Sequence, residues 1–191
     1  MALAVLVSGS DITKNSMKAA LCGILAALST VVMFFTGIIP VATLALPAIA
    51  GCLLIPVVAE VGISWGFGTF AVCAGLSFLL APDREAALLY LLFFGYYPVL
   101  TGVLDRVKNK TLRYVLKLLI FNAAVVTETL LAVFMLGIPW ETVEFLGKAT
   151  PLVLLLLANL VFVLYDRALN GLIALYFRKF SSQVRRFLKL K

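Results

Sequence analysis

The chain has 191 residues, of which 63% are apolar and only 13% are charged, whereas about a quarter of the residues in a soluble domain are charged. A soluble core of this size could not bury so much apolar surface, which excludes a soluble domain. The net charge is +7 and histidine is absent, so histidine-dependent catalytic triads and histidine metal sites are also excluded.

Six apolar stretches predict an all-α membrane protein, a six-transmembrane-helix bundle, because a helical crossing needs roughly 20 residues. Between residues 19 and 82, Glu60 is the only charged residue, and we divide this stretch into three spans. The second span carries Pro47 and Pro56, so we expect it to be kinked or broken. The predicted spans are 17–39, 41–58, 62–81, 86–104, 114–138 and 150–169.

Three segments are expected along the chain. Residues 1–16 form an N-terminal extension, because the sequence MKAA from residue 17 is typical of the start of a bacterial inner-membrane protein. Residues 17–175 form the transmembrane domain. Residues 176–191 form a basic amphipathic tail, whose apolar side chains recur every three or four residues; we expect it to lie on the anionic inner leaflet, with docking to a partner as the alternative.

The orientation follows from the basic residues. Most of them precede the first span, separate the fourth span from the fifth, or follow the sixth. With six spans these segments share one side, which the positive-inside rule makes cytoplasmic. We therefore predict a multi-pass plasma-membrane protein with both termini in the cytoplasm. The lipid bilayer accounts for the basic charge, and we expect no nucleic acid partner.

Few polar side chains lie within the predicted spans. Glu128 is in the outer part of the fifth span, where an isolated carboxylate is costly unless it is protonated, paired or facing an aqueous cavity. Asn122 lies less than two turns before it, and Asn159 lies in the outer half of the sixth span. We predict that these three residues and Tyr96 bind a small molecule from outside. Hydrogen bonding between helices is the alternative for Glu128 and Asn159, and a kinked packing helix is the alternative at Tyr96, which is followed by Tyr97-Pro98.

Other motifs are less specific. The pattern Asp-Arg-x-x-Asn occurs at residues 105–109 and 166–170, either as an interaction motif or as a common way to end a helix. No intramembrane protease or phosphotransferase motif is complete, so we expect no catalytic residues and no enzyme activity. We also expect no cofactor and no metal ligand.

The first span carries small residues on one helix face, because Ala19, Gly23 and Ala27 are four residues apart. Small side chains let the backbone of another helix approach closely. We predict that these residues dock a partner, with packing inside the bundle as the alternative.

Two segments carry a family resemblance: residues 17–29 (MKAALCGILAALS) and residues 83–98 (DREAALLYLLFFGYYP). These two segments and the six short predicted spans resemble the substrate-binding S-components of energy-coupling factor (ECF) transporters. The second segment is also similar to uncharacterised S-component-like proteins of Firmicutes. The resemblance covers nearly the whole chain. The docking motif of the family is Ala-x-x-x-Ala, and Gly23 replaces one alanine of that motif here.

The resemblance implies a subunit that captures a vitamin-like micronutrient from outside and docks on a transmembrane T-component driven by two ATPase subunits. The chain has no Walker A sequence, so any ATP hydrolysis lies in a partner. The apolar outer half suits an amphipathic ligand with an apolar ring system. A structural or scaffold protein of the cell-shape or cell-wall machinery is the main alternative; a channel is weaker, because no sustained polar helix face would line a pore.

Overall fold

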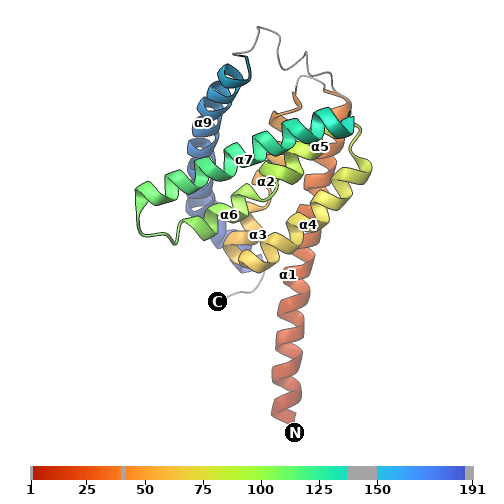
Figure 1. The fold of residues 1–191 in the computed structure, drawn as a ribbon. Coiled ribbons are helices and arrows are strands. Elements are labelled where there is room, and N and C mark those ends of the chain that lie inside the picture. The colour runs from red at the N-terminus through yellow and green to blue at the C-terminus, as the bar shows by residue number, and fades with distance from the viewer. Residues whose placement is uncertain (1, 40–41, 137–149, 188–191) are drawn as a thin grey trace.

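The structure is a computed structural model that describes residues 2–39, 42–136 and 150–187. The described residues form helices and no β-strand (Figure 1), which confirms the predicted all-α fold. In the described part of the chain, five helices are long and apolar enough to cross a membrane. They indicate a membrane protein.

The elements follow one another with short connections. In chain order they are α1 (Ala2–Phe34), η1 (Phe35–Gly37), α2 (Ala45–Cys52), α3 (Ile55–Glu60), α4 (Ile63–Leu80), α5 (Arg84–Leu89), η3 (Tyr90–Phe94), α6 (Tyr97–Leu104), α7 (Lys110–Leu136), α9 (Thr150–Lys179) and α10 (Ser181–Phe187). The five long spans comprise α1 from residue 15, α4, the α5–α6 segment, α7 and α9.

The predicted second span is broken, as its prolines indicated. α2 ends at Cys52 and α3 begins at Ile55, with Pro56 in its first turn, where the missing proline N–H costs no helical hydrogen bond. The whole segment, Ala45–Glu60, is shorter than the five long helices. Gly51 brings α2 against η3, because a methyl group at this position would overlap the carbonyl group of Phe94.

The predicted fourth span is also interrupted at the expected place. Its first half ends in the π-helical turn η3, and α6 starts at Tyr97 with Pro98 in its first turn. The aromatic side chains of this turn contribute to two different cores. Tyr90 packs into one hydrophobic core and Phe93 into another.

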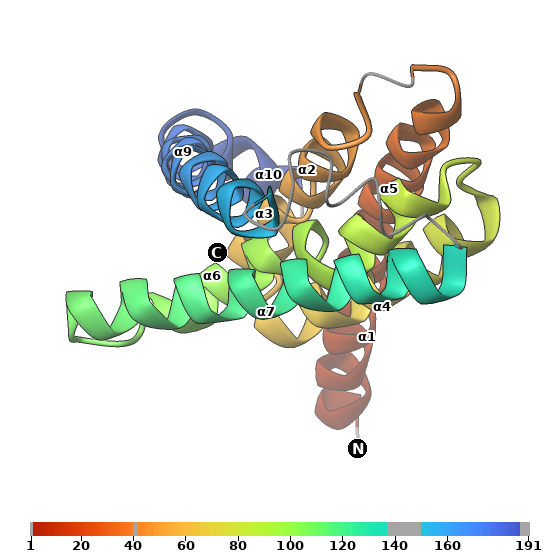
Figure 2. The same cartoon turned by 45° about the horizontal axis from the view of Figure 1, so that its top comes forward.

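The two cores divide the bundle between them. The first joins α1, α2, α4 and α5 with parts of η3 and α6, and Met33 and Leu54 are fully buried there. The second joins α3, η3, α6, α7 and α9 around Phe93, Phe121 and Phe162. Figure 2 shows α9 on the opposite side of the molecule from α1 and α4, with α2 and α3 between them.

Two ends of the chain differ from the predicted segments. Residues 2–16 continue without a break into the first span as part of α1, which extends beyond the bundle in Figure 1. The sixth span was predicted to end near residue 169, but α9 continues to Lys179, and a turn at Phe180 precedes α10. The end of the predicted fifth span, the residues from there to 149 and the last four tail residues lie outside the described residues.

The outward surface of the long helices is apolar. Leu79 on α4 is 74% exposed and Phe134 on α7 is 81% exposed, and several apolar side chains of α1 and many of α9 are also exposed. Such an extended apolar surface is unfavourable in water, whereas lipid tails solvate it. The folded surface therefore supports the same conclusion as the composition.

Candidate functional site

A cavity of about 320 Å³ lies between the α5–η3 segment, α7 and α9, with Leu44 also contributing to its wall. We call it the aromatic cavity, because its deep end is formed by aromatic side chains. These are Phe93, Phe94, Phe121, Phe162 and Tyr165. The cavity extends toward the ends of the helices where α7 finishes and α9 begins, since Glu128 and Leu154 also line it.

The aromatic wall is ordered by ring contacts between three helices. The rings of Phe121 and Phe162 stack with their centroids 4.5 Å apart and their planes at 16°. Phe93 contacts Phe121 edge-on, at 5.1 Å, and Tyr165 contacts Phe94 edge-on, at 5.2 Å. Aromatic pairs of these geometries contribute about 0.5–1.5 kcal/mol beyond their buried area. They hold α7 and α9 together at the base of the cavity.

The open part of the cavity results from small side chains above the stacked rings. Ala124 follows Phe121 on α7, Ala158 precedes Phe162 on α9, and both line the cavity. Residues three or four apart lie on the same helix face, so the two alanines leave room where larger side chains would meet.

Glu128 is the only charged residue among the described residues that line the cavity. It is half-buried, and its carboxylate forms no hydrogen bond or ion pair with a described residue. The nearby carboxylate of Glu85 repels it. The prediction that Glu128 belongs to a binding site therefore has a cavity to support it, although binding itself stays a prediction.

Tyr165 lines the cavity, but its hydroxyl oxygen is completely buried. It lies beside the Cys52 thiol, but the two groups do not meet hydrogen-bond geometry, so the buried hydroxyl has no partner among the described residues. A buried hydroxyl without a partner is rare and costs about 1–3 kcal/mol.

Asn122 and Asn159 meet each other instead of lining the cavity. Each side-chain amide donates to the carbonyl oxygen of the other at 2.9 Å. The two also donate to the backbone of their own helices, at Leu118 and Leu155. This is the helix-to-helix pairing that was the alternative interpretation for Asn159, and their predicted role in binding stays untested.

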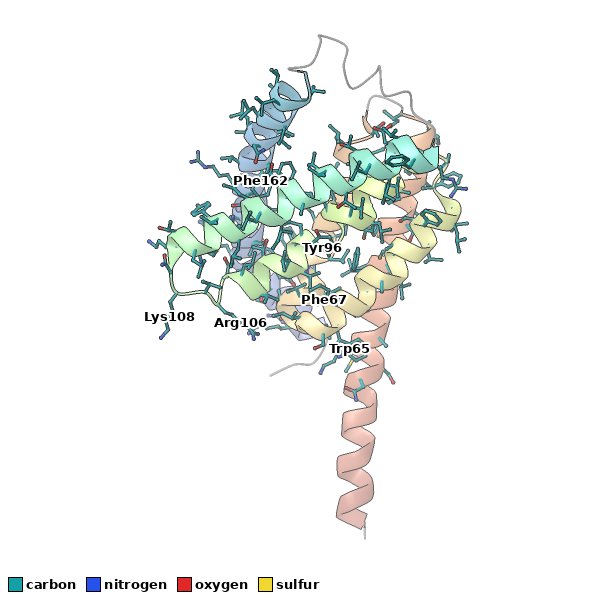
Figure 3. All side chains as sticks on the ribbon, viewed as in Figure 1. Trp65, Phe67, Tyr96, Arg106, Lys108 and Phe162 are labelled. Carbon is teal, nitrogen blue, oxygen red and sulfur yellow. The ribbon has the colours of Figure 1, made fainter. Side chains whose placement is uncertain are left out.

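Tyr96 lies outside the aromatic cavity. Its ring packs edge-on against Phe70 of α4, with the centroids 5.8 Å apart. Figure 3 shows it apart from Phe162 on α9. The structure therefore does not bring together the four residues predicted to bind the ligand: only Glu128 is at the cavity.

The small residues of α1 lie on its outer surface. Ala19, Gly23 and Ala27 are exposed, while Cys22 and Ala26 on the neighbouring face are buried. A shallow groove of about 300 Å³ runs between this part of α1 and α4, where Gly68 and Trp65 line it; Figure 3 shows Trp65 at the end of α4. A methyl group at Gly23 or Gly68 would meet no other atom within 4 Å.

Two buried polar clusters were not predicted from the sequence. In the first, Asp166 on α9 accepts hydrogen bonds from Lys117 and Tyr97. In the second, Glu60 at the end of α3 accepts hydrogen bonds from Ser181 and Arg185 of α10, and from Tyr176. The sequence signal that could have indicated these clusters is a charged residue inside an apolar stretch, because such a residue needs a partner. The aromatic wall had no such signal, because phenylalanine is common throughout the spans.

No group of three or more cysteine, aspartate and glutamate residues that could hold a metal ion occurs in the described part of the chain. Comparisons with known protein families, with curated proteins and with solved structures find no match to this chain. The functional argument therefore depends on the residues and geometry above.

Proposed function

We propose that the protein is the substrate-binding membrane subunit of an ECF-type transporter that takes up a vitamin or similar micronutrient. The observation that carries this proposal is the aromatic cavity with Glu128 at its wall. Binding sites for small molecules are concave and mostly apolar, with a few placed polar groups. A protein that served only as a scaffold would have no need to leave this space unfilled.

In the proposed topology the α2–α3 segment completes a sixth, broken crossing, and both termini face the cytoplasm. Charge supports this arrangement. The α6–α7 connection carries Arg106 and Lys108, which Figure 3 shows at the periphery of the bundle, and α10 carries Arg185 and Arg186. By the positive-inside rule these segments face the cytoplasm. The aromatic cavity, toward the far end of α7, then belongs to the outer half of the membrane.

The proposed partners are a transmembrane T-component and two ATPase subunits. The exposed face of α1 formed by Ala19, Gly23 and Ala27 would contact the T-component. Two features support this assignment: the three residues are exposed on the described bundle, and the adjoining groove is lined by small residues such as Gly23 and Gly68, which let the backbone of another helix approach closely.

The test is to release and identify small molecules that co-purify with the full chain in mild detergent, using mass spectrometry. We expect a vitamin-like compound at about one molecule per chain. Ala124→Phe, which fills the cavity, should remove the compound. Ala123→Phe adds the same ring to an exposed neighbouring position and should retain it. An empty wild-type protein, or equal ligand in both variants, would contradict the proposal and favour the scaffold alternative.

A further inference from the structure

We infer that the ligand of the aromatic cavity is a ring-bearing organic cation, whose ring packs above the stacked phenylalanines and whose positive charge pairs with Glu128. This inference rests on the proposed function, and it specifies the chemical class of the ligand. It derives from the charge, spacing and packing of the residues that line the cavity.

The carboxylate of Glu128 indicates that the ligand carries a positive charge. The group is in a span, its surroundings are apolar, and no described residue donates a hydrogen bond to it. An ionised carboxylate in such a place is costly without an opposite charge. A cation on the ligand would supply that charge, whereas an anionic ligand would face an unpaired carboxylate.

The charged residues around Glu128 also favour a positively charged ligand. Glu85, at the start of α5, adds a second negative charge whose repulsion reaches Glu128. The guanidinium of the adjacent Arg84 donates to the carbonyl oxygen of Phe78 and lies over the Phe78 ring, and no described base forms an ion pair with Glu85 or Glu128. Two carboxylates without an ion-pair partner among the described residues therefore favour a cationic ligand over an anionic one.

The geometry of α7 sets the distance between the Phe121 ring and the carboxylate-bearing residue Glu128. Seven residues separate Phe121 from Glu128, which is close to two helical turns, so both residues lie on one face of α7, about 10 Å apart along its axis. Ala124 lies between them, about 6 Å before Glu128. A flat ring above the Phe121–Phe162 stack would thus occupy the space beside Ala124, with its charged group directed along α7 toward Glu128.

The test uses three probes that share one ring system: naphthylmethylamine, which is a cation at neutral pH, naphthalenemethanol and naphthoate. Their binding to the purified full chain is measured by isothermal titration calorimetry. The Ala124→Phe variant measures the non-specific binding of the probes to detergent micelles, because its cavity is filled and only the micelles can still absorb the probes. We expect the amine to bind at least about tenfold more tightly than the alcohol, which corresponds to about 1.4 kcal/mol, and the naphthoate to bind most weakly.

Substitutions then assign the preference to Glu128. Glu128→Gln should bring the amine to the affinity of the alcohol, and Glu128→Asp should keep part of the preference. Asp105→Asn is the matched control, because it also converts a carboxylate to an amide but lies on the exposed α6–α7 connection; it should leave all three affinities unchanged. Unfolding temperatures confirm that each variant is folded.

The outcomes separate this inference from the proposed function. If the alcohol or naphthoate binds as tightly as the amine, and Ala124→Phe abolishes binding, then the cavity binds ligands but the cationic class is wrong. If Glu128→Gln leaves the amine preference intact, the assignment to Glu128 is wrong. If no probe binds above the Ala124→Phe background, the inference fails, and the absence of a co-purifying compound would then refute the proposed function as well.

Discussion

The Nζ atom of Lys117 lies 2.7 Å from Oδ1 of Asp166, and both side chains are almost completely buried, at 4% and 6% exposure. The Tyr97 hydroxyl donates to the same oxygen at 2.6 Å. The cluster therefore joins α6, α7 and α9 below the aromatic cavity. Two buried charges stabilise a fold only when they are paired and hydrogen-bonded, and this cluster meets both conditions.

Removing one partner of this pair should destabilise the protein strongly. We expect Lys117→Met or Asp166→Leu alone to lower the free energy of unfolding by about 3–5 kcal/mol, because a buried charge is left unpaired, while the double variant recovers most of this loss. Unfolding in detergent by heat or denaturant measures the effect. Arg113→Met is the control: it removes the more exposed ion pair with Asp105 and should cost about 1 kcal/mol or less. Equal effects of Lys117→Met and Arg113→Met would contradict this assignment.

The paired amides of Asn122 and Asn159 should contribute to helix association and not to ligand affinity. Asn159→Ala is expected to lower the free energy of unfolding by about 0.6–1.7 kcal/mol, the range for hydrogen bonds between membrane helices. The bound compound should remain, whereas Glu128→Gln should reduce its amount. Mass spectrometry of the purified variants provides the comparison. Loss of the compound in Asn159→Ala without loss of stability would instead place this residue in the binding site.

Glu60 should hold α10 against the end of α3. Its side chain is only 1% exposed, and it accepts from the Ser181 hydroxyl at 2.6 Å and from Nε of Arg185 at 2.8 Å. Hydrogen bonds to charged groups contribute about 1.5–3 kcal/mol each. Glu60→Ala should therefore release α10 and speed tryptic cleavage at Arg185 by at least about tenfold.

Ser182→Ala is the control for this experiment, because Ser182 neighbours Ser181 but is exposed. Its cleavage rate should equal that of the wild type. A Glu60→Ala protein cleaved no faster than Ser182→Ala would show that other contacts hold α10 in place.

The exposed glycine of α1 offers a test of partner docking. Gly23→Leu adds bulk to the small-residue face and should reduce the amount of co-purified T-component and ATPase subunits by at least about tenfold, because a closely packed helix can no longer approach. Ligand content should be unchanged. Gly75→Leu adds the same side chain to α4, at a glycine that is equally open, and should retain the partners. Equal amounts of partner in both variants would exclude docking at Gly23.

The helices and their breaks could be predicted from the sequence because their causes are local. Runs of apolar residues fix where helices long enough to span a membrane occur, and the interruptions near Pro56 and Pro98 follow from the missing proline N–H. The chain ends were predicted less well. The sequence has no proline or glycine cluster after residue 169 to stop α9, and the helix continues to Lys179.

The pairing of polar side chains was decided by the tertiary structure. Lys117 and Asp166 are 49 residues apart, and Glu60 and Arg185 are 125 residues apart; no spacing rule connects residues so distant in the chain. The same holds for the hydrogen bond between Asn122 and Asn159, which are 37 residues apart. The sequence by itself determined that Glu128 must be protonated, paired or facing an aqueous cavity, since an isolated carboxylate in a span is otherwise costly. Only the packing of α5, η3, α7 and α9 decided that it borders a cavity, because the space depends on which small side chains face each other across helices.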